Sequence, residues 1–308
     1  DPPAPPAPPA ASWNYDFSTG TLGTTYSWID CSSGNFVVSG DDQSAQITWP
    51  FDFNYYDNTY TTSNTISIST NGFLRMDGGA TSDYVTAINY NLTSTATNLG
   101  QIIAIALYDG NVSSGSWVRS LVTGTAPNRI FTIEFNNHEI DYNDSRYADA
   151  QVSFYESSNI IVLKLGIDNI DKSGVDMGLH SGVNTYFNKW QEVLSGTNNT
   201  WIEYLPPYVD VNATGGTLAA SYFSLKTAFD KINDGTHQGD ITVKINNSTT
   251  EATSAVLNAS GSGSANYSNV IIYPTKTGLS VSGNIAGPLI DLSGADNVTI
   301  DGRVNATG

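Results

Sequence analysis

Two short segments near the end of the chain have almost the same pattern. One reads Asn-Val-Ile-Ile-Tyr over Asn269–Tyr273, and the other reads Asn-Val-Thr-Ile-Asp over Asn297–Asp301, starting 28 residues later. Two further strand-like runs, Gly278–Ser282 and Pro288–Leu292, lie between them. This spacing is typical of successive turns of a parallel β-solenoid, in which each turn buries its inward side chains against its neighbours.

The residues after the second segment contain no pattern that predicts a capping element. An uncapped solenoid end exposes a strand edge, and soluble proteins cover such edges. We therefore expect this end to be continued by further chain or covered by a partner.

The composition favours an all-β extracellular protein. Only 13% of the residues are charged, whereas Ser, Thr, Asn, Gly and Tyr are abundant, as on the outer faces of solvated strands. The net charge of −17 argues against nucleic acid and anionic membranes as partners. No apolar run is long enough for membrane insertion. A single cysteine, Cys31, excludes an internal disulfide, favours a prokaryotic surface protein and predicts a small buried side chain.

Three regions are expected along the chain. Residues 1–12 are rich in proline and predict an extended polyproline segment. Residues 13–207 alternate short β-like runs with turn signals, which predicts an antiparallel β-sandwich ending at Pro206-Pro207. Its expected strands include Thr65–Ser69, followed by an Asn71-Gly72 hairpin turn, Ile102–Leu107, Arg129–Phe135, Gln151–Tyr155 and Ile160–Leu165.

Residues 208–308 are expected to form a cap helix and the first turns of a parallel β-helix. The helix is predicted across Ser221–Asn233, with Gly235 as its stop. Its apolar face is expected to hold Phe223 or Leu225, together with Ala228, Phe229 and Ile232. A lone amphipathic helix before a solenoid can cover the open end of the stacked sheets. The fold class is therefore all-β: an antiparallel β-sandwich followed by the helix-capped N-terminal turns of a parallel β-helix.

Both parts resemble segments of large secreted bacterial surface proteins of the adhesin type, of the kind found in the Bacteroidetes. In the first part the resemblance rests on Trp49–Phe53, Ser69–Leu74, Asp109-Gly110, Pro127–Phe135 and Gln151–Glu156, in the order of a nidogen-like β module. In the second part it rests on Tyr222–Asn233, Gly287–Leu292 and Gly294–Gly302, which look like the start of a right-handed parallel β-helix. The resemblance implies an architecture more than an activity.

The acidic runs are the only candidate cofactor site. Asp168, Asp171 and Asp176 have the oxygen-rich, turn-prone character that Ca²⁺ favours, although they match no EF-hand loop, and solvated turns are the alternative. Asp41-Asp42, after Gly40, predicts a turn. The three histidines, His138, His180 and His237, lack metal-ligand spacing and are expected at surface or loop positions.

Two other residue classes could mark surface functions. The sequence offers Asn-X-Ser/Thr glycosylation candidates at Asn91, Asn111, Asn143, Asn198, Asn212, Asn246, Asn258 and Asn266. Tyrosines gather in the first region, at Tyr55, Tyr56, Tyr60, Tyr84 and Tyr90. Exposed aromatic rings could stack on sugars, and packing within a sandwich core is the alternative.

These features predict a secreted or cell-surface protein without catalysis in this segment. The leading interpretation is an adhesion or display protein, with a β-helix stalk, a β-sandwich recognition module, and surface glycans or neighbouring copies of itself as partners. A subunit of an extracellular filament or sheath is one alternative. The N-terminal part of a polysaccharide-degrading β-helix enzyme is another. The solenoid region offers Asp291, Asp296, Asp301 and Arg303 for such chemistry, but Asp296 and Asp301 fall at expected turns, and about two solenoid turns are too few for a substrate groove.

Overall fold

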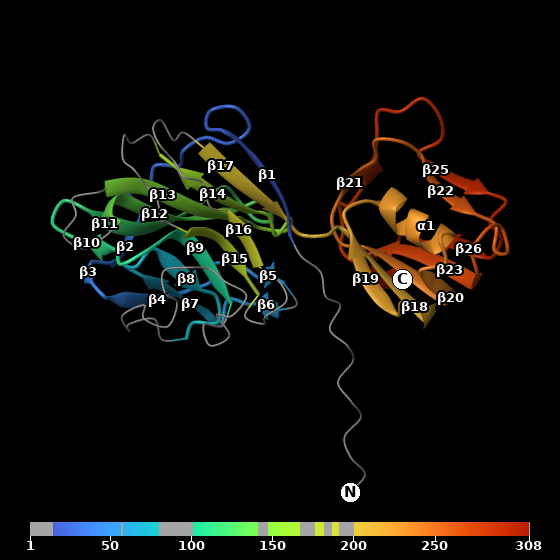
Figure 1. Cartoon of the computed structure of the whole chain (residues 1–308), viewed down its shortest axis with the longest axis horizontal. Coiled ribbons are helices and arrows are strands. Elements are labelled where there is room, and N and C mark those ends of the chain that lie inside the picture. The colour runs from blue at the N-terminus through green and yellow to red at the C-terminus, as the bar shows by residue number, and fades with distance from the viewer. Residues whose placement is uncertain are drawn as a thin grey trace, which may run out of the picture. The chain divides into compact units, whose positions relative to one another are not determined.

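The computed structural model describes residues 15–56, 58–79, 101–140, 147–166, 176–181, 187–190 and 200–307. The predicted Pro-rich segment, residues 1–12, lies outside these ranges. The chain divides into two compact units, of which the first spans Asn14–Leu205 and the second contains Pro206–Gly308. Nearly all regular structure in the described residues is β (Figure 1).

The strands of the first unit are β1 (Asp16–Thr21), β2 (Asn35–Val38), β3 (Gly40–Asp41), β4 (Ser44–Thr48), β5 (Phe53–Tyr55), β6 (Asn58–Tyr60), β7 (Thr65–Ser69), β8 (Phe73–Arg75), β9 (Ile102–Leu107), β10 (Asn111–Val112), β11 (Trp117–Thr123), β12 (Ile130–Glu139), β13 (Tyr147–Tyr155), β14 (Ile161–Leu165), β15 (Asp176–His180), β16 (Phe187–Trp190) and β17 (Thr200–Leu205). The predicted bounds of β7 and β9 are confirmed.

Two antiparallel sheets form the layers of this unit (Figure 1). One runs β1-β17-β14-β13-β12-β10-β3, with β11 also paired to β12 and β2 paired to β11. The other runs β16-β15-β9-β8-β7-β4. A small hairpin of β5 and β6 completes the unit. The layered antiparallel arrangement is sandwich-like, as the alternating patterns predicted.

An aromatic cluster fills the core of the first unit. Trp49 is 1% exposed, its ring stacks on Phe53 at a centroid distance of 5.5 Å, and it meets Phe154 edge-on at 5.0 Å. Phe154 lies on β13, whereas Trp49 directly follows β4 and Phe53 begins β5. Aromatic packing therefore fixes the segment between β4 and β5 onto the long sheet.

The second unit holds β18 (Val209–Gly216), β19 (Ala219–Tyr222), α1 (Leu225–Asn233), β20 (His237–Ile245), β21 (Thr249–Thr250), β22 (Ala255–Asn258), β23 (Tyr267–Pro274), β24 (Val281–Ser282), β25 (Ile290–Ser293), β26 (Val298–Ile300) and the short 3₁₀ turn η2 (Val304–Ala306). Among the described residues, no helix combines the length and apolar character that a membrane crossing requires.

Three sets of parallel strands follow one another in this unit. The chain passes through β20, β21 and β22, and then returns to pair β23 with β20, β24 with β21 and β25 with β22. β26 then pairs with β23, with Val270 opposite Val298 and Ile272 opposite Ile300. The two similar segments of the sequence are thus hydrogen-bonded neighbours in parallel register, 28 residues apart along the chain.

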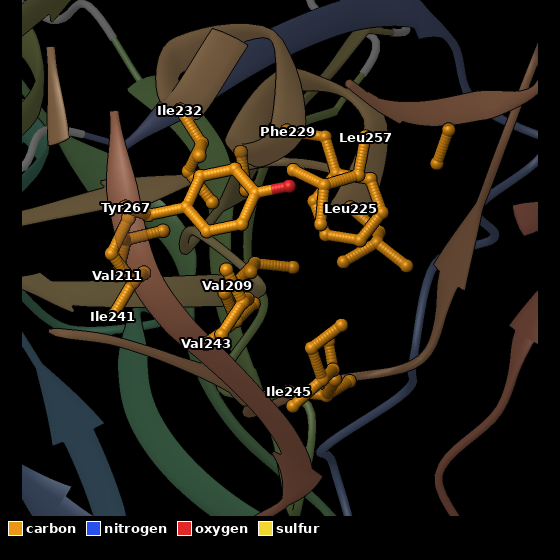
Figure 2. Packing of buried hydrophobic residues seen from close by; sticks show 14 of the residues in the cluster. Val209, Val211, Leu225, Phe229, Ile232, Ile241, Val243, Ile245, Leu257 and Tyr267 are labelled. Carbon is orange, nitrogen blue, oxygen red and sulfur yellow. The ribbon is translucent and has the colours of Figure 1, made fainter. Parts of the chain in front are cut away.

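Helix α1 covers the apolar interior of the strands. Figure 2 shows Leu225, Phe229 and Ile232 of the helix facing the side chains of β18 and β20, such as Val211 and Val243. The predicted apolar face is confirmed with Leu225 rather than Phe223, because Leu225, Ala228, Phe229 and Ile232 are all buried. The predicted start at Ser221 is wrong, because Ser221 belongs to β19, which pairs with β18. Ser224 caps the helix instead, and its Oγ accepts the Thr227 N–H at 3.0 Å.

Both ends of α1 are tied to the region of β22. The carboxylate of Glu251 accepts the N–H groups of Leu225 and Lys226, each at 3.0 Å. At the other end, Nδ2 of Asn233 donates to the Val256 carbonyl at 2.8 Å, and its Oδ1 accepts the Asn258 N–H at 2.9 Å. The Asn233 carboxamide thereby pairs with the backbone of β22 as a neighbouring strand would. These bonds give the helix a fixed seat on the stacked strands.

Candidate functional site

Three carboxylates meet at one place on the first unit. Asp41 ends β3, Asp42 follows it directly, and Asp109 follows β9. One oxygen from each carboxylate can be chosen so that all three lie within 4.8 Å of one another. Asp42 and Asp109 are half-buried, whereas Asp41 is exposed. Residues from distant parts of the sequence thus form one acidic cluster, which we define as Asp41, Asp42 and Asp109.

Backbone pairing holds the turns that carry this cluster. Asp41 lies opposite Asn111 in the β3–β10 pair. This pairing places Asp41 next to the turn between β9 and β10, which contains Asp109. The Gln43 N–H donates to Oγ1 of Thr70 at 2.9 Å, and the Thr70 N–H donates to the Gln43 carbonyl at 2.9 Å. Asp42 adopts a left-handed backbone conformation with φ of 51°, which aspartate tolerates better than most residues.

Asn71 lies beneath the acidic cluster and is fully buried. Its Nδ2 donates to Oδ1 of Asp42 at 2.9 Å, whereas its Oδ1 is buried without a hydrogen-bond partner. The next residue, Gly72, has φ of 74°, and a Cβ there would lie 2.0 Å from the Ala106 carbonyl oxygen. Only glycine fits this hairpin turn, which joins β7 to β8 as predicted and fixes the position of Asn71.

Negative charge accumulates around the cluster. Partial burial and the charges of Asp42 and Glu139 raise the pKa of the Asp41 carboxyl above its usual value. Glu139 lies on β12 and accepts a hydrogen bond from Nδ2 of Asn111 at 2.9 Å. The arrangement thus concentrates carboxylate oxygens where a cation would be attracted.

The calcium ligands expected from sequence lie elsewhere. Asp168 and Asp171 fall outside the residues that the structure describes, and Asp176 begins β15, opposite Leu107 of β9. Calcium at these three residues stays a prediction. The acidic cluster was not predicted as a site. Gly40-Asp41-Asp42 and Asp109-Gly110 each indicate only a turn, and nothing in the sequence brings the two turns together.

The glycosylation candidates differ in accessibility. Asn111 and Asn246 engage Nδ2, the atom that would carry a glycan, in hydrogen bonds to Glu139 and Asp210, and Asn212 and Asn258 are half-buried in strands. Asn266 is exposed just before β23, and its Nδ2 donates a long, exposed hydrogen bond to Oε1 of Gln238 at 3.3 Å. Asn91, Asn143 and Asn198 lie outside the described residues. Glycosylation stays a prediction, for which Asn266 is the most accessible described position.

The three histidines are buried, contrary to the surface positions expected. His138, His180 and His237 lie on β12, β15 and β20 and are at most 1% exposed. Burial lowers the pKa of His138 to about 4, and its Nε2 lies 2.7 Å from the Thr70 carbonyl oxygen. The error has a simple cause: a neutral imidazole with a backbone partner is accepted inside a sheet, which residue type alone does not reveal.

The tyrosines and Cys31 belong to the core. Tyr55, Tyr56 and Tyr60 are at most 7% exposed, which excludes these three from an exposed sugar-stacking surface. Tyr84 and Tyr90 lie outside the described residues. Cys31 is fully buried, as predicted, and burial together with the nearby Glu134 carboxylate raises the pKa of its thiol to about 12. A thiol in this state is a weak nucleophile.

A row of buried polar side chains crosses the long sheet beside Cys31. Glu134, Gln151 and Lys164 are direct neighbours on β12, β13 and β14, and all are at most 3% exposed. Glu134 accepts hydrogen bonds from the indole of Trp28 at 3.0 Å and from the Cys31 N–H at 2.8 Å. The row therefore holds the segment between β1 and β2 against the sheet.

Lys164 gives this row a measurable pH dependence. Burial lowers the pKa of its ammonium from 10.5 to about 8, so between these values the unfolded chain binds one proton more than the folded chain. The free energy of unfolding is expected to rise across this window by about 3 kcal/mol relative to a Lys164→Met variant. Urea denaturation of both proteins at several pH values measures the difference. A difference that stays constant with pH would contradict the shifted pKa.

An apolar cavity of about 180 Å³ lies in the second unit. Its lining includes Leu225 of α1, Ile272 of β23, Ile290 of β25 and Ile300 of β26. Polar groups are few along it, and Asp301 is the only acidic side chain among its lining residues, which also include Tyr273. Its lining therefore brings together no cluster of polar side chains such as a catalytic site requires.

Comparison with known proteins bears on the first unit. No curated protein and no solved structure matches the chain. A family model described as NIDO related matches residues 14–206, which include the whole described part of the antiparallel unit and about three fifths of the chain. The chain belongs to the NIDO-related family.

Proposed function

We propose that this chain is part of an extracellular, cell-surface structural protein of the adhesin type, without catalysis in this segment. The NIDO-related family is of an extracellular type, which supports the location. In this proposal the NIDO-related unit is the recognition module and the second unit begins a right-handed β-helix that serves as a stalk. Bacterial origin belongs to the same proposal.

The observation that carries the proposal is the order of the parallel strands. Along the chain, each strand from β20 to β23 pairs in parallel with the strand three places later, up to β26. The paired residues lie 28 to 35 positions apart in the sequence. A chain that visits three parallel sheets in turn winds as a coil, and such a coil can be lengthened one turn at a time. A rigid, extendable body of this kind suits display of a module away from a surface.

Binding assays with the full chain test the recognition role. We expect retention on a subset of immobilised glycans, or on whole cells, through loops of the NIDO-related unit, because Tyr55, Tyr56 and Tyr60 are buried in its core. Immunogold labelling of the source cells is expected to place the protein at their outer surface. Absence of retention on glycans and on cells, together with labelling inside the cells, would reject the proposal.

A specific observation favours a second candidate, a subunit of an extracellular filament or sheath. Three apolar side chains on the parallel strands are exposed: Ile271 at 36%, Leu292 at 40% and Ile300 at 53%. Ile300 also belongs to β26, which is paired on one side only among the described strands. A strand of a neighbouring copy could add to this edge. Electron microscopy of native material distinguishes the candidates, since monomers at high concentration exclude the filament.

The absence of catalysis also belongs to the proposal. Asp301 forms a local ion pair with Arg303 at 2.7 Å, and the Arg303 N–H donates to Oδ1 of Asp301 at 2.9 Å, as in a polar turn. This arrangement uses the carboxylate to shape the backbone. Incubation of the full chain with acidic polysaccharides is expected to release no new reducing ends. Release that disappears in an Asp301→Asn variant would overturn this part of the proposal.

A further inference from the structure

We propose that the acidic cluster, Asp41, Asp42 and Asp109, forms a Ca²⁺ site together with Oδ1 of Asn71. The site would tie together three turns of the NIDO-related unit: the turn after β3, the β7–β8 hairpin and the turn after β9. It is independent of the adhesion role and involves none of the residues Asp168, Asp171 and Asp176.

The distances between the carboxylates fit one shared ion. Oxygen ligands lie about 2.4 Å from Ca²⁺, so two ligands of the same ion can be separated by at most about 4.8 Å. The chosen oxygens of Asp41, Asp42 and Asp109 all satisfy this limit. Three carboxylates held this close repel one another, and a divalent cation between them would convert that repulsion into attraction.

Asn71 supplies an independent observation that points to a ligand. Its side chain reaches the cluster, because Nδ2 donates to Oδ1 of Asp42. The oxygen of the same carboxamide is buried and has no hydrogen-bond partner. Buried polar atoms are almost always paired, because an unpaired one costs about 1–3 kcal/mol. A cation bound beside Asp42 would supply the missing partner, since amide oxygens are ordinary ligands of Ca²⁺.

The donor set favours Ca²⁺ over other metals. All four proposed ligands are oxygen atoms, which disfavours Zn²⁺ and Cu²⁺ because these prefer nitrogen or sulfur. The ligands come from turns at several places in the chain, and Asp41 is exposed, so solvent can complete an irregular shell. Mg²⁺ requires nearly ideal octahedral geometry and gives up its water reluctantly. Extracellular modules commonly bind Ca²⁺ with dissociation constants of about 0.1–1 mM.

Calorimetric titration of the full chain with CaCl₂, after removal of metals by a chelator, tests the site directly. We expect this cluster to bind one Ca²⁺ per chain. We also expect the NIDO-related unit to have a higher melting temperature in Ca²⁺ than in Mg²⁺ at the same concentration. Asp42→Asn and Asp109→Asn are each expected to weaken this binding at least about tenfold. Asp16→Asn, which changes an exposed carboxylate on β1, is the matched control and should leave the affinity unchanged.

The same variants remain informative without metal. Removing one of three crowded carboxylates should raise the melting temperature of the calcium-free protein, so Asp42→Asn and Asp109→Asn are expected to fold. Asn71→Asp has the opposite effect, because it adds a buried charge next to Asp42. We expect Asn71→Asp to lower the melting temperature in chelator and to recover most of that loss in saturating Ca²⁺. A cluster that binds no ion would give the loss in both conditions.

Three results would overturn the proposal. The first is no calorimetric signal and no change in melting temperature up to about 10 mM Ca²⁺, well above the usual range for such modules. The second is binding that survives Asp42→Asn and Asp109→Asn with unchanged affinity. The third is binding that is lost only in an Asp168→Asn, Asp171→Asn and Asp176→Asn triple variant, which would move the calcium site to the residues expected from sequence.

Discussion

Replacing Trp49 by alanine is expected to lower the free energy of unfolding of the NIDO-related unit by about 3–5 kcal/mol. The indole ring is 1% exposed and packs against Phe53, Tyr60, Phe131 and Phe154, with ring-centroid distances of 5.0–6.0 Å. Its loss would leave a cavity between the long sheet and the segment that carries Phe53. Urea denaturation of the full chain, followed by near-ultraviolet circular dichroism, measures the change.

Trp49→Phe is the matched control for this variant. It keeps an aromatic ring in the stack and removes the indole N–H, which is buried without a hydrogen-bond partner. The loss of ring volume and the relief of the unpaired donor oppose each other, so a change of less than about 1.5 kcal/mol is expected. Equal stabilities of the wild type and Trp49→Ala, combined with lost glycan binding, would show that Trp49 serves as a sugar platform rather than as core.

The sequence predicted the fold best where one physical signal dominated. Thr65–Ser69 alternates strictly and Ile102–Leu107 is continuously apolar, and both strands have the predicted bounds. The start of the helix was harder to predict, because Ser221 and Tyr222 fit the end of an amphipathic pattern as well as a strand. Pairing of β19 with β18 decided between them, and that is a tertiary contact.

Sites assembled from separate turns were beyond sequence analysis for a different reason. Asp42 and Asp109 each looked like an ordinary turn residue, and only the β3–β10 pairing brings their turns together. Asn71 was assigned to a hairpin from its Asn-Gly signature, which was correct but said nothing about its unpaired oxygen. Local patterns report backbone conformation, whereas a binding site depends on which side chains meet after folding.

The position of helix α1 on the strands depends on Glu251, a residue that no local sequence pattern indicated. Glu251 is 2% exposed, precedes β22, and accepts the N–H groups of Leu225 and Lys226 from the first turn of the helix. These donors have no partner within a helix, and a carboxylate also interacts favourably with the positive end of the helix dipole. Glu251 is itself held by its backbone, because its N–H donates to the Ser282 carbonyl at 2.7 Å. Ser282 belongs to β24, so the pairing with this strand positions the Glu251 carboxylate at the start of the helix.

Glu251→Ala is expected to destabilise the second unit by about 3 kcal/mol, because it removes two charge-assisted hydrogen bonds and leaves the buried Leu225 N–H unpaired. Hydrogen exchange followed by mass spectrometry should show faster exchange at Leu225 and Lys226, while the NIDO-related unit keeps its protection. Glu251→Gln retains an acceptor oxygen and should lose about half as much. Lys226→Ala breaks only the exposed pair with Asp230 and should cost about 0.3–0.5 kcal/mol. If Glu251→Ala were no more harmful than Lys226→Ala, the helix would be held by its apolar face alone, and the carboxylate cap would be incidental.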